Sequence, residues 1–94
     1  MKSIIQNNKE CYFCHTTLGL HCHHIYFGIA NRKISEANGF KVYLCNRHHE
    51  NDLKGNDVHH NYEMNLKLKQ DCQREFEKTH TREEFRSLIG RSYL

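Results

Sequence analysis

Tryptophan is absent from this chain, and only 37% of its 94 residues are hydrophobic. A chain of this length buries roughly 65% of the surface that its unfolded form exposes, so such a core is only marginally stabilising by itself. The length also excludes a two-domain enzyme. We therefore expect one domain, residues 1–94, that needs a source of stability besides its apolar core.

Long apolar runs are missing as well. The longest stretch of apolar or small residues is 25–30, whereas a helix that crosses a bilayer needs roughly 20 such residues. The first ten residues contain no sustained apolar segment, so no secretory signal is readable there. We expect a cytoplasmic protein whose cysteines stay reduced and are available as metal ligands.

Positive and negative charges are nearly balanced, since 14 Lys and Arg residues stand against 11 Asp and Glu, which gives a net charge of +3. This balance permits nucleic-acid binding but does not by itself indicate it. Metal-ligating side chains are abundant instead, with five cysteines and nine histidines. Because packing does not require so many of them, they indicate a bound metal that supplements the core.

The cysteines and histidines are concentrated in residues 11–60, which we call the chemical segment. A polar N-terminal segment, 1–10, precedes it, and a helical segment, 61–94, follows it. In the chemical segment, β-branched and aromatic residues predict strands at 20–26 and 40–44. Residues 27–39 between them are expected to be mostly an irregular loop with one helical turn at most.

A short helix is expected after Cys45, ending at Gly55. In the helical segment, apolar residues recur every four positions from Met64 to Phe76 and predict one helix. Thr81 and Glu84 have the spacing of a capping box, which predicts a second helix that stops at Gly90. We therefore expect an α+β fold in which C-terminal helices cover a small sheet.

Two tight pairs predict a structural zinc site. Cys11 and Cys14 are separated by two residues, and so are Cys45 and His48. Each pair can place two ligands on one turn, and together they supply the four nitrogen and sulfur ligands of tetrahedral zinc. His49 is an alternative to His48 as the fourth ligand. The bound metal would contribute folding energy to a chain that is short of core.

Two adjacent histidine pairs are harder to explain by packing. Strand alternation sends His23 and His24 to opposite faces, so a core cannot take both in the same way. A second pair, His48 and His49, follows the next expected strand. The sequence thus predicts that these imidazoles belong to a functional site.

The run Leu20-x2-His23-His24-Ile25, with Cys-x2-Cys before it and Leu44-Cys45-x2-His48-His49 after it, resembles the HNH endonucleases. The resemblance covers 11–55 and implies a ββα-metal fold, in which two strands and a helix grip one divalent cation. It implies that His23 and His49 bind the catalytic metal and that His24 is the general base. The middle asparagine of the family has no counterpart at the expected place, where Asn38 is the nearest.

The later Gly, Val58-His59 and Phe-Glu elements are similar to phage recombination-enhancement nucleases, which implies His59 as a further ligand of the catalytic metal. The remaining histidines, His15, His21, His60 and His80, are expected to be solvated or structural. Imidazole ligands suit Mn2+, Ni2+, Zn2+ or Co2+ and suit Mg2+ less well. A phage-encoded protein of this kind would work in the host cytoplasm.

Under this reading the partner is DNA, expected to be double-stranded, and the affinity comes from phosphate contacts. The candidate contacts are Arg32, Lys33, Lys41, Arg47 and Lys54. So few cations predict weak binding unless a partner protein delivers the enzyme to its substrate, and a homodimer would make double-strand breaks easiest. No aromatic platform for single strands is evident, since Tyr26, Phe27 and Tyr43 are expected in the core.

An alternative hypothesis, from another functional class, is a non-catalytic zinc-binding module that contacts nucleic acid or a protein partner. Its additional histidines would only line a second structural metal. A metal sensor is a third reading, but nothing in the sequence favours it.

Overall fold

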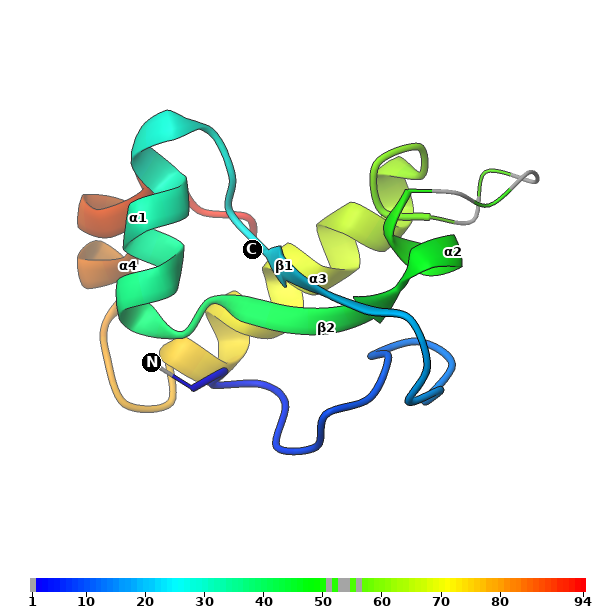
Figure 1. Ribbon diagram of the computed structural model, residues 1–94. Helices are drawn as coiled ribbons and strands as arrows, with labels where there is room; N and C mark the ends of the chain where they lie inside the picture. Colours follow the sequence, from blue (N-terminus) through cyan, green and yellow to red (C-terminus); the bar gives the residue numbers. More distant parts are fainter. Residues whose placement is uncertain (1, 51, 53–54, 56) are drawn as a thin grey trace.

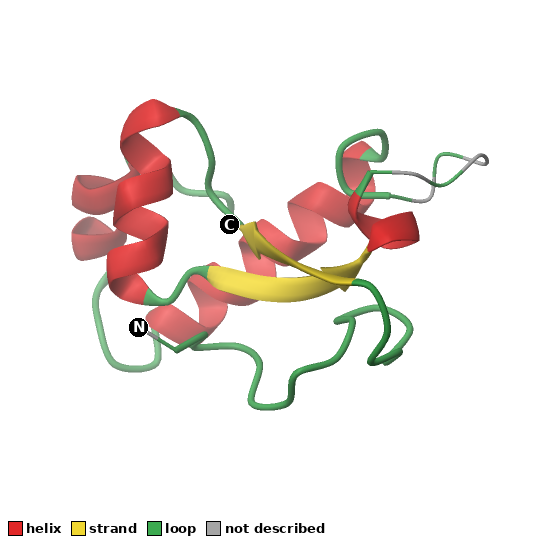
Figure 2. Ribbon diagram, in the orientation of Figure 1, coloured by secondary structure: helices red, strands yellow, loops and turns green. Residues whose placement is uncertain are grey.

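The computed structural model describes residues 2–50, 52, 55 and 57–94 and has an α+β architecture (Figure 1). Strands β1 (Leu20–His24) and β2 (Lys41–Cys45) form a two-stranded antiparallel sheet. The helices are α1 (Ile29–Asn38), α2 (Asn46–His49), α3 (Tyr62–Phe76) and α4 (Arg82–Ile89). Helix α3 passes behind the sheet, α1 and α4 lie together at one end of it, and α2 lies at the other end (Figures 1 and 2).

The strand register assigns each side chain of the sheet to one of two faces. Leu20 pairs with Cys45 at one end, and His24 pairs with Lys41 at the other. Because successive side chains alternate, the inner face carries His21, His23, Val42 and Leu44. The outer face carries Cys22, His24, Lys41 and Tyr43. Val42 and Leu44 are buried, so the inner face is the one that joins the core.

The free edge of β2 is covered by the N-terminal segment, 2–12. The Ile4 amide donates to the Gly39 carbonyl at 3.0 Å, and the Tyr12 amide donates to the Tyr43 carbonyl at 3.0 Å. Between these two anchors, the Tyr43 amide donates to the Gln6 side-chain oxygen at 2.7 Å. The segment therefore satisfies backbone groups that an open sheet edge would expose.

Residues 29–38 form helix α1, so the expectation of a mostly irregular loop at 27–39 is wrong. The helix is held by the Ser35 hydroxyl, which donates to the Tyr26 carbonyl at 2.7 Å. It ends at Gly39, whose φ of 74° lies in the left-handed region. A Cβ at this glycine would collide with the Lys2 carbonyl oxygen, so the N-terminal segment can pack there only against glycine.

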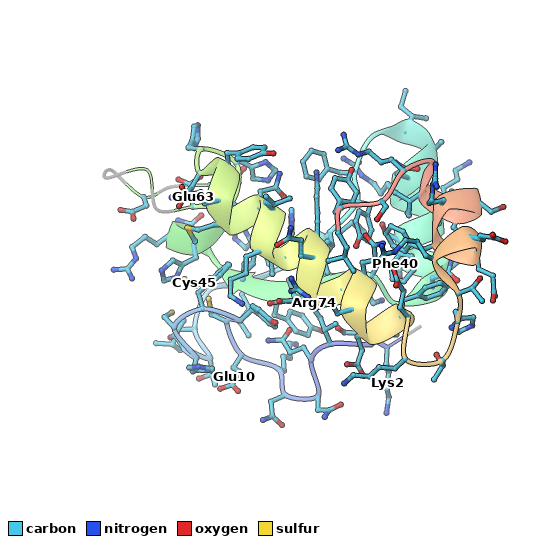
Figure 3. The ribbon with its side chains drawn as sticks, turned by 180° about the vertical axis from the view of Figure 1, so that it is seen from behind. Lys2, Glu10, Phe40, Cys45, Glu63 and Arg74 are labelled. Carbon is cyan, nitrogen blue, oxygen red and sulfur yellow. The ribbon has the colours of Figure 1, made fainter. Side chains whose placement is uncertain are left out.

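The C-terminal helices agree with the sequence. Leu68, Cys72 and Phe76 of α3 are all buried. They pack in the same core as Phe40, the residue before β2, and Phe85 of α4. Figure 3, seen from behind, shows α3 crossing in front of the sheet, with Phe40 to one side of it, toward α1 and α4. These helices form the cover that the sequence predicts for the sheet.

Helix α4 begins with the expected capping box. The Glu84 amide donates to the Thr81 hydroxyl at 3.1 Å, and the Thr81 amide donates back to the Glu84 carboxylate at 3.1 Å. The helix ends at Gly90, which is in the left-handed conformation. Both ends of α4 are therefore confirmed.

Some boundaries differ from expectation. Strand β2 spans Lys41–Cys45 rather than 40–44. Strand β1 ends at His24 rather than at 26. Helix α2 ends at His49, with Glu50 as its C-cap, rather than at Gly55. Residues 51, 53–54 and 56 lie outside the described part of the chain. Among the described helices, none is long and apolar enough to cross a membrane.

Candidate metal centres and the adjoining hollow

Three thiols and one imidazole meet where the N-terminal segment reaches the start of α2. The ligand atoms of Cys11, Cys14, Cys45 and His48 all lie within 4.8 Å of one another. The Cys14 and Cys45 sulfurs are 3.7 Å apart. The His48 Nδ1 lies 3.2 Å from the Cys45 sulfur and 3.6 Å from the Cys11 sulfur. We call this group the thiolate cluster.

These separations fit a tetrahedral zinc ion. A tetrahedral zinc ion has bonds of about 2.3 Å to sulfur and about 2.0 Å to nitrogen. At tetrahedral angles, these bonds place two sulfur ligands about 3.8 Å apart, and a sulfur and a nitrogen ligand about 3.5 Å apart. The observed 3.7 Å and 3.6 Å agree with these values, and the 3.2 Å pair is slightly compressed. The Cys3His cluster could therefore hold a structural metal ion.

The turn that carries the first cysteine pair favours a thiolate. The Cys11 amide donates to the Thr16 carbonyl, and its own carbonyl accepts from the His15 amide, each at 2.9 Å. Burial would raise the pKa of the Cys11 thiol, but hydrogen bonds from the backbone of Cys45, Cys14 and Phe13 lower it to about 6. A thiolate is the form that binds zinc.

The two neighbouring histidines of α2 serve different groups. His48 faces the thiols, whereas His49 lies with the imidazoles of His23 and His59. Of the alternatives that the sequence leaves open for the fourth zinc ligand, the geometry favours His48.

His23, His49 and His59 form a second group, the imidazole cluster, whose ligand atoms also lie within 4.8 Å of one another. The three ring centroids are 4.9 to 5.5 Å apart, and the Nε2 atoms of His49 and His59 are 3.2 Å apart. His23 is only 3% exposed. Its Nε2 atom is buried and has no hydrogen-bond partner among the described residues.

This arrangement fits a divalent cation. Two nitrogens on one ion at about 2.1 Å are separated by about 3.0 Å at octahedral and about 3.4 Å at tetrahedral angles, which brackets the observed 3.2 Å. Burial, and then the neighbouring His49 and His59, lower the pKa of His23 to about 3. A neutral imidazole with a buried, unpartnered nitrogen is the form that binds a metal.

The segment before α3 presents His59 to the cluster. The Val58 amide donates to the His48 carbonyl at 2.9 Å, which fixes this segment against α2. Asp57, fully buried, accepts from the backbone amide and the ring of His60 at 2.9 and 2.8 Å. Burial would raise the pKa of Asp57, but these bonds and the Asp52 amide hold it below its ordinary value.

His21 has a defined place that the sequence analysis did not give it. Its Nδ1 lies 2.9 Å from the Nδ1 of His49, so it holds the His49 ring by the nitrogen that does not face His59. Hydrogen bonds of this kind fix the tautomer and orientation of metal-binding histidines. The available signal was strand alternation, which places His21 and His23 on one face.

His24, on the outer face of β1, lies beside the imidazole cluster rather than in it. Its Nε2 is 2.8 Å from a carboxylate oxygen of Glu36, a residue of α1. The other oxygen of Glu36 accepts from the Lys41 ammonium at 2.9 Å. The hydrogen bond from Lys41, and then that from His24, lower the pKa of Glu36 to about 2, so it is a carboxylate. The sequence gives no signal for Glu36, because it lies in the segment expected to be a loop.

The imidazole cluster and His24 open onto one hollow of about 460 Å³. Its lining residues are Cys22, His23, His24, Phe27, Arg32, His49, Glu50 and His59. Phe27 is 41% exposed there, so its expected place in the core is wrong, whereas Tyr26 is buried and Tyr43 is half-buried. The edge strand β1 thus presents both of its adjacent histidines to the same space.

The expected phosphate contacts are scattered. Arg32 lines the hollow, and Lys41 lies on the outer face, bonded to Glu36. Lys33 is exposed on α1. A guanidinium nitrogen of Arg47 lies 3.3 Å from the His48 Nε2, beside the thiolate cluster. Lys54 lies outside the described residues.

Other polar residues singled out by the sequence have local structural roles. The Asn38 side chain donates to the Ile34 carbonyl within α1 at 2.9 Å. The ring of His80 stacks on Phe76 with centroids 4.2 Å apart. His15 lies at the surface, 3.5 Å from a carboxylate oxygen of Glu10. None of these three contacts involves the imidazole cluster.

The chain matches no protein-family model, and no curated protein or solved structure matches it either. Its function therefore has to be inferred from the chemistry of the site.

Proposed function

We propose that this protein is a metal-dependent endonuclease of the HNH type that hydrolyses phosphodiester bonds in DNA. The observation that carries the proposal is the imidazole cluster. Three histidine nitrogens gather within ligand distance, one of them buried without a partner, and a fourth histidine lines the same hollow. The resemblance of the sequence to the HNH endonucleases supports the same conclusion.

In this proposal, His23, His49 and His59 hold one divalent cation, which when bound acts as a Lewis acid toward the phosphate and the leaving oxygen. Three nitrogen ligands leave further coordination positions for substrate. Arg32 lines the hollow, and its guanidinium can donate to phosphate oxygens. The thiolate cluster has only a structural role.

His24 is the general base in this proposal. A neutral imidazole carries one N–H, and the Glu36 carboxylate, 2.8 Å from Nε2, accepts it. The lone pair then belongs to Nδ1, which can take a proton from the attacking water. A positioned general base typically contributes 10²- to 10⁴-fold to the rate, on the order of what His24 is asked to supply.

The test is nicking of supercoiled plasmid in the presence of Mn2+, Ni2+ or Mg2+. We expect cation-dependent nicking by the wild type and a loss of about 10²- to 10⁴-fold in His24→Ala. His80→Ala is the matched control, because this exposed histidine lies against Phe76. A His24→Ala variant that nicks as fast as the wild type would falsify the assignment of the base.

The alternative, a non-catalytic zinc-binding module, rests on the thiolate cluster alone and gives a different result. It predicts no cation-dependent nicking by any variant and one tightly held zinc per chain. The nuclease predicts one tightly held zinc together with one exchangeable cation, and the exchangeable cation is lost in His23→Ala.

A further inference from the structure

A groove larger than the hollow runs over the outer face of the sheet, with a volume of about 710 Å³. Its floor is formed by the outer-face residues Cys22, Lys41 and Tyr43 of the two strands. Its wall is the N-terminal segment, from Lys2 to Lys9. We propose that this groove binds the sugar-phosphate backbone of the DNA strand that leads to His24, an inference that rests on the proposed function.

The wall is fixed in place rather than loosely attached. It is anchored by the hydrogen bond from Ile4 to Gly39 at 3.0 Å and by the bond from the Tyr43 amide to Gln6 at 2.7 Å. The Ser3 hydroxyl accepts from the amides of Ile5 and Gln6 at 3.2 and 3.1 Å. A groove between a sheet and a segment held in this way is preformed for a ligand.

The charge of the groove suits a polyanion. Lys2, Lys9 and Lys41 line it, and none of the described lining residues is an aspartate or glutamate. The Lys41 ammonium forms an ion pair with the Glu36 carboxylate at 2.9 Å. No ion pair with a carboxylate involves Lys2 or Lys9 in the described part of the chain. These two ammonium groups are therefore available to neutralise phosphates.

The remaining lining suits a nucleic acid strand more than a single small anion. The amides of Asn7 and Asn8 and the ring of Tyr43 lie beside the lysines, and the Lys9 ammonium is 5.5 Å from the centre of that ring. Amides can donate to phosphate and sugar oxygens, and an aromatic ring can contact a sugar or a base. Contacts of this kind position a strand without reading its sequence.

The groove leads to the proposed reaction site. Cys22 lines both the groove and the hollow. His24 lies on the same outer face as Cys22, directly opposite Lys41 in the strand register. A strand that follows the floor of the groove therefore passes His24 before it reaches the imidazole cluster around the edge of β1.

The experiment measures DNA binding by fluorescence anisotropy over a range of salt concentrations, with labelled single-stranded and duplex oligonucleotides. All proteins carry His24→Ala, so the substrate stays intact. Lys2→Gln with Lys9→Gln removes the two unpaired charges of the groove. Lys67→Gln with Lys78→Gln is the control, since it removes the same charge from α3 and the turn that follows it, where both lysines are in exposed ion pairs that contribute little to stability.

We expect the groove variant to bind roughly tenfold more weakly. The slope of log K against log salt concentration should fall by about 1.8 if the groove holds duplex DNA and by about 1.4 if it holds a single strand, because two phosphate contacts are lost. The control variant should keep both the wild-type slope and the wild-type affinity. Equal weakening in both variants, or no change in the groove variant, overturns the proposal, and thermal melting establishes that both variants are folded.

The outcome is separable from that of the proposed function, because binding is measured without cleavage. If the wild type nicks plasmid but the groove variant binds like the control, only the groove assignment fails. If the wild type does not nick plasmid but the slope still depends on Lys2 and Lys9, the nuclease assignment fails and the groove remains a nucleic-acid site.

Discussion

The reactivity of single cysteines distinguishes a metal-bound thiolate cluster from four free side chains. Cys14 and Cys22 are both exposed, so exposure alone predicts that iodoacetamide modifies both. Cys72 is fully buried, and burial raises its pKa to about 12. In zinc-loaded protein we expect mass spectrometry to find modification at Cys22 only, because the Cys14 sulfur is engaged by the metal.

A denaturant together with a chelator provides the control for this experiment. Under those conditions all five cysteines should become modified, Cys72 among them. Modification of Cys14 at the same rate as Cys22 in the folded, zinc-loaded protein would contradict the assignment of Cys14 as a ligand.

Glu36 is a positioning residue in the proposed mechanism, because it touches His24 and not the substrate. Glu36→Gln keeps the size of the side chain but removes the negative charge that accepts the hydrogen bond, at 2.8 Å, from the His24 Nε2. We expect kcat for plasmid nicking to fall roughly 10- to 100-fold with little change in KM, a magnitude typical of groups that orient a functional histidine. Glu36→Asp should recover part of the rate.

Glu83→Gln is a matched control for this substitution, because Glu83 is exposed on α4 and does not contact His24. A Glu36→Gln variant with the same kcat as Glu83→Gln would show that the orientation of His24 does not depend on Glu36.

At the residue scale, the sequence indicates which side chains could form the two clusters but not which atoms meet. The spacing of Cys11, Cys14, Cys45 and His48 was sufficient to predict a zinc group. It could not choose between His48 and His49, because consecutive residues on a short helix differ only in direction. Glu36 could not be found at all, because its contact with His24 spans a segment whose helix was not predicted.

At the scale of elements, α4 depends on its first turn. The Thr81 hydroxyl accepts from the Glu84 amide at 3.1 Å, and the helix places Phe85 and Ile89 in the core. Removing such a cap costs about 1 kcal/mol, so Thr81→Ala should lower the melting temperature by roughly 4–8 °C in a domain of this size. Thermal unfolding followed by circular dichroism measures it.

Ser87→Ala is the control for the cap, since Ser87 is exposed in the interior of the same helix. It should be neutral or slightly stabilising, because alanine is the better helix former. If both variants melt at the same temperature, the capping box does not contribute to stability.

Helices α1 and α3 show why one helix could be predicted from the sequence and the other could not. α3 has an apolar residue at every fourth position and buries Leu68, Cys72 and Phe76, so its period is visible. The only buried residue of α1 is Ser35, and Ile29 at its start is 95% exposed. Its position is set by the Ser35 contact with Tyr26 and by Gly39, which are tertiary features without a hydrophobic period.

On the scale of the whole molecule, the thiolate cluster links distant parts of the chain. Cys14 and Cys45 are 31 residues apart, and Cys11 and His48 are 37 apart. The core beneath them is small, as the hydrophobic content of 37% indicates. A metal bound there would therefore close a long loop that includes both strands and α1, on the same helix that carries His49.

Removal of this metal should unfold the protein. Structural zinc supplies apparent binding energies of about 10–16 kcal/mol in small zinc domains, which is comparable to or larger than the typical stability of about 5–15 kcal/mol for a whole domain. We expect a strong zinc chelator to abolish the cooperative thermal transition seen by circular dichroism, and Cys14→Ser to lower the melting temperature of untreated protein sharply. His59→Ala should melt near the wild type, because His59 is an exposed residue of the other cluster. An unchanged melting curve in the presence of the chelator would mean that the fold is held by its apolar core alone.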